Sequence, residues 1–243
     1  MTSAKRTHSA AYNRIVERAR NQALIPKDLS IPLLDIQGAP GEAHPAFSET
    51  EIAQPWEQMG HRGRTMFICQ LCRSHVEFLL VVGVRTGTET MPLRWKHLQW
   101  HYIGPQKYLK IWVSGKTGPR YLIAKHAVIE TLNRLIVFQG LPFEDLTQLM
   151  DAGYNRTTFV MEDGTQPDSL NGTFERLLGD CNLLKDVAGR NRSFYSLRHT
   201  YATFALAEGV DIHILARQMG ASTLMIERHY SKLTPMMAAP KLA

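Results

Sequence analysis

The spacing of apolar side chains predicts helices along most of the chain. In residues 8–24 apolar positions recur at helical spacing with basic residues between them. Residues 65–82 form a longer, mostly apolar run that ends near Gly83, which predicts a buried helix. Further helical patterns cover residues 126–138, 143–151 and 170–179, and two or three short helices are predicted within residues 194–232.

One segment follows the alternation of a strand instead. Residues 108–124, "YLKIWVSGKTGPRYLIA", alternate, turn at a stretch rich in glycine and proline, and resume as apolar sequence. This pattern predicts a β-hairpin. Together with the helical segments it predicts a mainly α fold with a small antiparallel β-sheet, and the chain contains neither repeats nor a low-complexity tract.

Prolines and glycines mark a boundary early in the chain. They are concentrated in residues 26–47, which predicts an extended linker between a helix in residues 1–25 and a domain in residues 48–243. Ser48 and Glu51 form a capping box that starts a helix before Ile52 and Trp56, and Pro55 shortens or kinks that helix. Later, Gly209 breaks a helix and Asp211 caps the next one.

Composition and charge narrow the class of protein. The chain of 243 residues has 28 basic and 22 acidic side chains, a net charge of +6, which favours a polyanionic partner without proving one. No apolar run approaches the ~18 residues that a membrane helix needs. The N-terminus carries no apolar core of a secretory signal. We expect a cytoplasmic protein with no membrane contact.

Three cysteines indicate a reducing compartment rather than a disulfide framework. Cys69 and Cys72 have the spacing of a metal or redox pair, with His75 three residues further on. No second pair follows, and the surrounding sequence is helical, so the favoured interpretation is that they are small apolar fillers. We expect no metal and no cofactor.

Four residues are candidates for chemistry, and each has a simpler interpretation. Arg85 follows the buried helix with Glu89 four residues on, the spacing of an ordinary ion pair. Lys116 lies at the tip of the hairpin, where lysines are usually solvated; a phosphate-binding loop is excluded because its first glycine is absent and a strand follows. Arg198 opens an apolar helix, and Tyr230 alone fits packing as well as chemistry.

Taken together, the four residues form the equipment of a metal-free phosphoryl transesterase. Two guanidiniums can bind phosphate oxygens and neutralise developing charge. A lysine can protonate a leaving oxygen, and a tyrosine hydroxyl can act as a covalent nucleophile. The sequence contains no cluster of acidic residues typical of a two-metal site.

The chain resembles the catalytic domain of the tyrosine recombinases, the phage integrase family. "GVRTGTETMPLRWKHL" is similar to the family's first arginine box, which makes Arg85 the first catalytic arginine and Glu89 its supporting acid. The hairpin is similar to the one that carries the catalytic lysine, here Lys116. "YSLRHTYAT" resembles the second box with Arg198, and "RQMGASTLMIERHY" ends on the nucleophile position, Tyr230.

The resemblance covers residues 48–235, and within this range the sequence departs from the family pattern at two positions. Tyr195 replaces the usual histidine three residues before the second arginine, and is a poorer proton acceptor near neutral pH. Ala221 replaces the usual histidine or tryptophan after Gly220, which removes a donor to phosphate; His229 is a possible substitute. We interpret His199 as a buried support of the site rather than as a catalytic group.

The resemblance implies a site-specific recombinase or integrase, encoded by a bacterium or phage, that cuts and rejoins DNA through a 3′-phosphotyrosyl intermediate without metal or ATP. Its expected partners are double-stranded DNA and further copies of the chain, four in this family. Residues 8–24 resemble only the last helix of a core-binding domain, and residues 231–243 are apolar enough to pack on a neighbour. Alternatives are a decayed integrase that binds DNA without catalysis, and a type IB topoisomerase-like enzyme.

Overall fold

The computed structural model describes residues 2–26, 29–34, 44–52 and 66–230. These residues belong to two compact units, Met1–Ala43 and His44–Ala243. The expected helix positions Pro55 and Trp56, and the C-terminal segment expected to pack on a neighbour, lie outside the described residues.

The first unit consists of helix α1 and the chain that follows it. Helix α1 (Thr2–Asn21) confirms the helix predicted for residues 8–24, but begins earlier and ends sooner. The amide side chain of Asn13 exchanges two hydrogen bonds of 2.9 Å with the backbone of Leu34. Val16, also on the helix, is buried. The segment around Leu34 is thereby hydrogen-bonded to α1.

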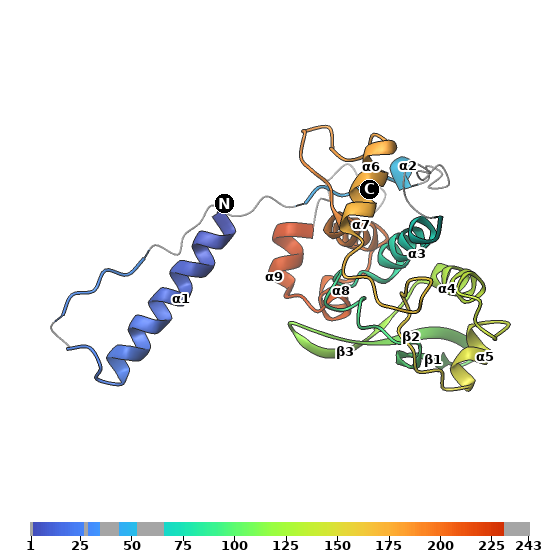
Figure 1. Ribbon diagram of the computed structural model, residues 1–243, viewed down its shortest axis with the longest axis horizontal. Coiled ribbons are helices and arrows are strands. Elements are labelled where there is room, and N and C mark those ends of the chain that lie inside the picture. The colour runs from blue at the N-terminus through green and yellow to red at the C-terminus, as the bar shows by residue number, and fades with distance from the viewer. Residues whose placement is uncertain (1, 27–28, 35–43, 53–65, 231–243) are drawn as a thin grey trace. The chain divides into compact units, whose positions relative to one another are not determined.

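The second unit contains the remaining helices and a three-stranded sheet (Figure 1). In chain order its elements are α2 (Glu49–Ile52), α3 (Met66–Val82), η2 (Trp95–His97), β1 (Leu98–Ile103), β2 (Gln106–Gly115), β3 (Gly118–Ile123), α4 (Ala127–Phe138), α5 (Leu146–Asp151), α6 (Asn171–Asp180), α7 (Phe194–Ala207), α8 (Ile212–Met219), α9 (Thr223–Met225) and η3 (Ile226–Tyr230). This architecture confirms the mainly α fold with a small antiparallel sheet.

The sheet is antiparallel with the strand order β1-β2-β3. The predicted hairpin is formed by β2 and β3, while strand β1 was not predicted. In the β2–β3 ladder Ile111 is opposite Leu122 and Val113 is opposite Arg120. Because side chains alternate along a strand, Arg120 is placed on the same face as buried Leu122. Lys116 lies in the short turn between the two strands.

Two groups of buried apolar side chains share helix α7. The larger group joins the sheet to α3, α4 and α6, and includes Phe194 and Leu197 from the start of α7. The smaller group joins the second half of α7 to α8 and η3, and includes Tyr201 and Ile226. Helix α7 is therefore packed at both ends, and most of its side chains are buried.

Local signals in the sequence set several element boundaries. The Ser48 hydroxyl accepts from the Glu51 amide at 3.3 Å while the Glu51 carboxylate accepts from the Ser48 amide at 2.8 Å, which confirms the predicted capping box. Asp211 caps α8 as predicted, because its carboxylate accepts from two amides of the first turn. Among the helices of the described residues, none has the length and apolarity to cross a membrane.

Gly83 ends α3 in a conformation and a space that only glycine fits. Gly83 and Gly87 both have positive φ, +71° and +78°. A methyl group at position 87 would meet nothing within 4 Å, whereas at position 83 it would lie 2.2 Å from a ring carbon of Tyr201. We expect Gly87→Ala to lower the free energy of unfolding by about 1–2 kcal/mol through backbone strain alone.

Gly83→Ala should lose about 1–3 kcal/mol more, because the ring of Tyr201 must also move. Urea denaturation of the two variants and the wild type measures the difference. Equal losses in both variants would show that the contact with Tyr201 relaxes without cost.

Candidate active site

Arg85 lies just beyond the end of α3, where Gly83 turns the chain. Its guanidinium donates to the Glu89 carboxylate at 2.8 Å, and its backbone amide donates to the other carboxylate oxygen at 2.8 Å. The same guanidinium also donates to the Thr117 hydroxyl at 3.2 Å and to the Gly220 carbonyl at 2.5 Å. Arg85 is thus an oriented, half-buried side chain in contact with two distant segments.

Glu89 is the buried acid of the site, with only 1% of its surface exposed. Besides Arg85 it binds Arg120, whose two terminal nitrogens donate to the two carboxylate oxygens at 2.8 and 2.9 Å. Burial alone would raise the pKa of Glu89. The hydrogen bonds and charges of Arg120 and Arg85 outweigh burial and lower that pKa to about 2.

Arg198 is placed on α7 and is 1% exposed. One terminal nitrogen donates to the Gly83 carbonyl and the other to the Met219 carbonyl, each at 2.6 Å. The Met219 carbonyl immediately precedes the Gly220 carbonyl that accepts from Arg85. Two arginines from distant parts of the sequence therefore converge on one helical turn, the C-terminal end of α8 with its cap Gly220 (residues 218–220). We call Arg85, Glu89 and Arg198 together with this turn the arginine site.

Lys116 and Thr117 form the exposed tip of the β2–β3 hairpin. The bond from Arg85 to the Thr117 hydroxyl joins this tip to the arginine site. Within the described part of the chain the Lys116 ammonium has no bonding partner. The structure thus brings Lys116 to the edge of the arginine site and leaves its side chain exposed.

Tyr230 closes the short helix η3 that follows the turn of residues 218–220. The Ser222 hydroxyl accepts from the Met225 amide at 3.2 Å and starts α9, and fully buried Ile226 anchors η3 in the smaller core. The side chains of Tyr230 and His229 lie outside the part of the chain that the structure describes. A cap and a core residue thus anchor the short segment that ends at Tyr230.

Tyr195 and His199 lie on α7 beside a third ring. The ring centre of Tyr195 is 5.3 Å from that of His199 and 5.2 Å from that of His44. His199 is buried, as expected for a support, whereas Tyr195 is half-buried. His44 falls within the predicted linker, and its contact with α7 was not foreseen. Burial lowers the pKa of the His44 imidazole.

Arg120 is the residue of this site that the sequence reasoning missed. Its Nε donates to the Gln218 carbonyl and Nη2 to the Met219 carbonyl, both at 3.1 Å, in addition to its bonds with Glu89. The available signal was the alternation of the hairpin, which places Arg120 on the face of buried Leu122. A charged side chain at an inward position requires a buried partner.

Among the comparisons with known proteins, the one with solved structures gives matches. No family model matches the chain, and no curated protein does. Solved structures do: XerH site-specific recombinase bound to its difH substrate (15% identity, TM-score 0.58) and Tn1549 transposon integrase in complex with circular intermediate DNA (18%, 0.61). A lambda integrase tetramer bound to a Holliday junction also matches (15%, 0.59).

The chain has the tyrosine recombinase fold. The match covers 89%, 98% and 88% of this chain, and 57%, 77% and 55% of XerH, Tn1549 integrase and lambda integrase, respectively. The chain therefore spans little more than half the length of two of these three structures.

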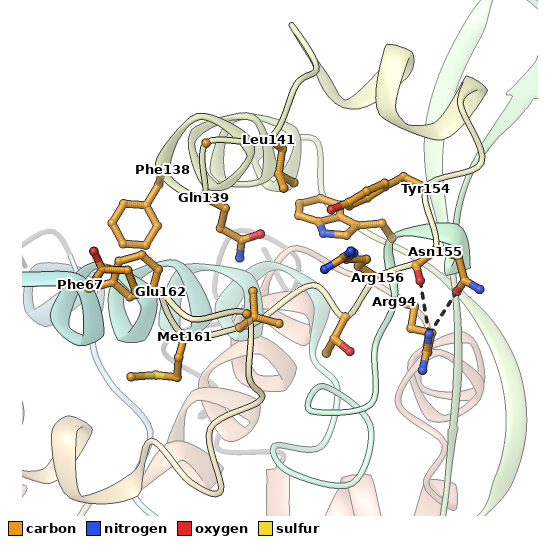
Figure 2. Close-up of a pocket in the computed structure, with 15 residues that line it drawn as sticks. Phe67, Arg94, Phe138, Gln139, Leu141, Tyr154, Asn155, Arg156, Met161 and Glu162 are labelled. Atoms are coloured by element: carbon orange, nitrogen blue, oxygen red, sulfur yellow. Dashed lines mark hydrogen bonds between the residues drawn. The ribbon is translucent and has the colours of Figure 1, made fainter.

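A cavity of this tyrosine recombinase fold lies apart from the arginine site. Among the described residues, no three His, Cys, Asp or Glu side chains lie close enough together to hold a metal ion. A cavity of about 590 Å³ lies between the start of α3, the end of α4 and the loop of residues 154–164 (Figure 2). Arg94 lines this cavity and donates to Asn155. None of the candidate site residues is among the residues that line it. The arginine site lies instead where the end of α3, the exposed hairpin tip and the turn of residues 218–220 meet.

The low pKa of Glu89 predicts an acid-dependent loss of stability. The folded pKa of about 2 lies below the ordinary value of 4.5, so the carboxylate stabilises the folded chain above pH 4.5 and loses this contribution as the pH falls toward 2. The shift corresponds to about 3 kcal/mol. We expect Glu89→Gln to be less stable at pH 7, with a difference from wild type that disappears near pH 2.

Urea denaturation between pH 7 and pH 2.5 measures this difference. The control is Glu130→Gln, because the Glu130 side chain is 78% exposed and binds Arg134 on its own helix. Its effect should stay within about 0.5 kcal/mol at every pH. A Glu89→Gln curve parallel to that of the wild type would contradict the assignment.

Proposed function

We propose that this chain is a site-specific DNA recombinase that cuts and rejoins DNA strands through a covalent bond to Tyr230. The tyrosine recombinase fold supports the proposal, and one observation carries it. Arg85 and Arg198 converge on the turn of residues 218–220, and Tyr230 follows ten residues after Gly220, at the end of η3. Two guanidiniums and a tyrosine in this relation are suited to one phosphodiester.

In the proposed cleavage step, the Tyr230 hydroxyl gives its proton to water, and its oxygen attacks phosphorus to form a 3′-phosphotyrosyl bond while the bond from phosphorus to the 5′-oxygen breaks. Arg85 and Arg198 neutralise the charge that develops on the non-bridging oxygens. Lys116, exposed at the hairpin tip, gives a proton to the departing 5′-oxygen. The 5′-hydroxyl of another strand then attacks the phosphotyrosyl bond and releases Tyr230 on a new junction.

The burial of Arg198 sets a condition on this mechanism. Its guanidinium is 1% exposed and donates to two backbone carbonyls. Contact with a phosphate oxygen requires its surroundings to open, for example by a shift of the turn of residues 218–220 or of the guanidinium. DNA binding should therefore exchange a carbonyl acceptor for a phosphate oxygen, with the proton donors of Arg198 satisfied in both states.

The partners follow from the chemistry. Strand exchange needs two duplexes, so we propose that the chain acts on double-stranded DNA as an oligomer of four copies, the assembly of the matched lambda integrase. The net charge of +6 is consistent with a DNA partner. We further propose that α1 corresponds to the last helix of a core-binding domain, joined by the predicted linker to the catalytic domain.

A second candidate is a DNA-binding protein of the same fold without catalysis. Ala221 favours it, because a methyl group cannot donate to phosphate where the family has histidine or tryptophan. The buried state of Arg198 favours it as well. The retention of Arg85, Lys116, Arg198 and Tyr230 together favours the enzyme.

Tyr230→Phe separates the two candidates. On a nicked suicide substrate made from the DNA that flanks the gene, we expect the wild type to accumulate a covalent complex and the variant to form none. Binding of the same DNA should persist, because the change removes one hydroxyl. Denaturing gels measure the complex, and fluorescence anisotropy measures binding. A wild type that binds the substrate without forming the complex supports the non-catalytic candidate; a complex in the variant points to another nucleophile.

Ala221→His tests the missing donor. If the lost hydrogen bond weakens transition-state stabilisation by about 1–3 kcal/mol, its return should raise the single-turnover rate of covalent complex formation about 5- to 150-fold. Ala221→Val is the control, because it adds bulk without a donor. An equal rate in the Ala221→His variant and the wild type would show that another group already donates to this phosphate oxygen.

A further inference from the structure

Arg120 joins three of the segments that carry the candidate site. Its guanidinium binds both oxygens of Glu89, which belongs to the arginine box of Arg85. The same group donates to the carbonyls of Gln218 and Met219, in the turn that leads to Tyr230. Arg120 itself lies on β3, just after the hairpin tip that carries Lys116. One side chain thus joins all three segments.

Two glycines enclose this ion pair. A methyl group at Gly115 would lie 2.9 Å from a side-chain oxygen of Glu89, and one at Gly220 would lie 2.7 Å from Nη1 of Arg120. Gly115 directly precedes Lys116, and Gly220 has a φ of +60° that other residues rarely adopt. The backbone of the hairpin tip and that of the turn therefore approach the two charged groups as closely as glycine allows.

The planar guanidinium explains why this contact orients the segments instead of only joining them. Arginine presents several donors in a fixed fork, and here the fork meets two carboxylate oxygens and two carbonyls at once. A rotation of β3 relative to the turn breaks at least one of these bonds. A second contact acts in the same direction, because the Gln218 amide side chain exchanges hydrogen bonds with the backbone of Ile123 at the end of β3.

We propose that Arg120 is a positioning residue that holds the hairpin tip, the arginine box and the turn in one register and so sets the rate of the covalent step. The inference rests on the proposed recombinase function. Arg120 acts through Glu89 and the carbonyls of the turn, and through them on Lys116, Arg85 and the segment of Tyr230. Its contribution is to the placement of these groups and not to the bond that breaks.

Arg120→Lys and Arg120→Ala test the proposal on the full chain with the nicked suicide substrate. Lysine keeps the charge beside Glu89 but cannot span all four acceptors, so this variant should fold and still react about 10²-fold more slowly. DNA affinity should change much less than the single-turnover rate. Millimolar guanidinium chloride should restore part of the rate of Arg120→Ala, because the free ion fits the vacated position.

Arg134→Ala is the matched control. Arg134 on α4 also joins two helices through carboxylates, Glu77 on α3 and Glu130 on its own helix. It should lose some stability, keep the wild-type rate and show no response to guanidinium. A wild-type single-turnover rate in folded Arg120→Lys would overturn the proposal. So would a loss of rate in Arg120→Ala that matches its unfolded fraction and that guanidinium does not restore.

Amide hydrogen exchange separates this inference from the proposed function, since it needs no DNA. The amides of Gly220 and Ala221 are bonded to the carbonyls of Arg217 and Ala216 at 3.3 and 3.0 Å. We expect them to exchange faster in Arg120→Ala and unchanged in Arg134→Ala. If the wild type forms no covalent complex, the recombinase proposal fails. The exchange rates still test whether Arg120 holds the turn, and equal rates in Arg120→Ala and the wild type would reject that inference as well.

Discussion

The site depends on the burial of one carboxylate. Taking Glu89 out of water is costly unless its charge is matched, and the fold matches it with two guanidiniums and a backbone amide. Each guanidinium then has donors left over, and these reach the carbonyls of residues 218–220. The requirement to satisfy one acid thereby brings together the end of α3, strand β3 and the turn before η3.

Helix α7 supplies the second constraint. Its first residues pack in the larger core and its later ones in the smaller core, so the helix has little freedom to slide or rotate. Arg198 lies between these two contacts, and its guanidinium reaches the Gly83 carbonyl at the end of α3. The close contact of Gly83 with the Tyr201 ring therefore affects both arginines. It holds the bend after α3 that leads to Arg85, and it holds the carbonyl that accepts from Arg198.

What the sequence could predict was local. The helices of α3 and α4, the hairpin, the Ser48 capping box and the Asp211 cap all follow from signals within a few residues, and the structure confirms each of them. The Arg85–Glu89 pair has the same local origin, because its partners are four residues apart. The roles of Arg85, Lys116, Arg198, Tyr230 and Tyr195 came from resemblance and remain predictions.

The rest depends on contacts between distant residues. Strand β1 lacks a clear alternation of its own and is held by pairing with β2. Arg120 binds Glu89 and the turn, and His44 lies beside Tyr195. These contacts join residues that are far apart in the sequence, so no local spacing predicts them. Only the inward position of Arg120 on β3 hinted that a buried acid would be needed.

The charges at this site favour an anion. Among the residues that the structure describes, the guanidiniums of Arg85, Arg120 and Arg198 and the ammonium of Lys116 are set against the carboxylate of Glu89. Backbone carbonyls accept the remaining hydrogen bonds, but as dipoles they do not cancel the net positive charge. A phosphodiester does, and more strongly when a further negative charge develops during its cleavage. The arrangement that stabilises Glu89 thus leaves a surplus of positive charge where the proposed reaction requires it.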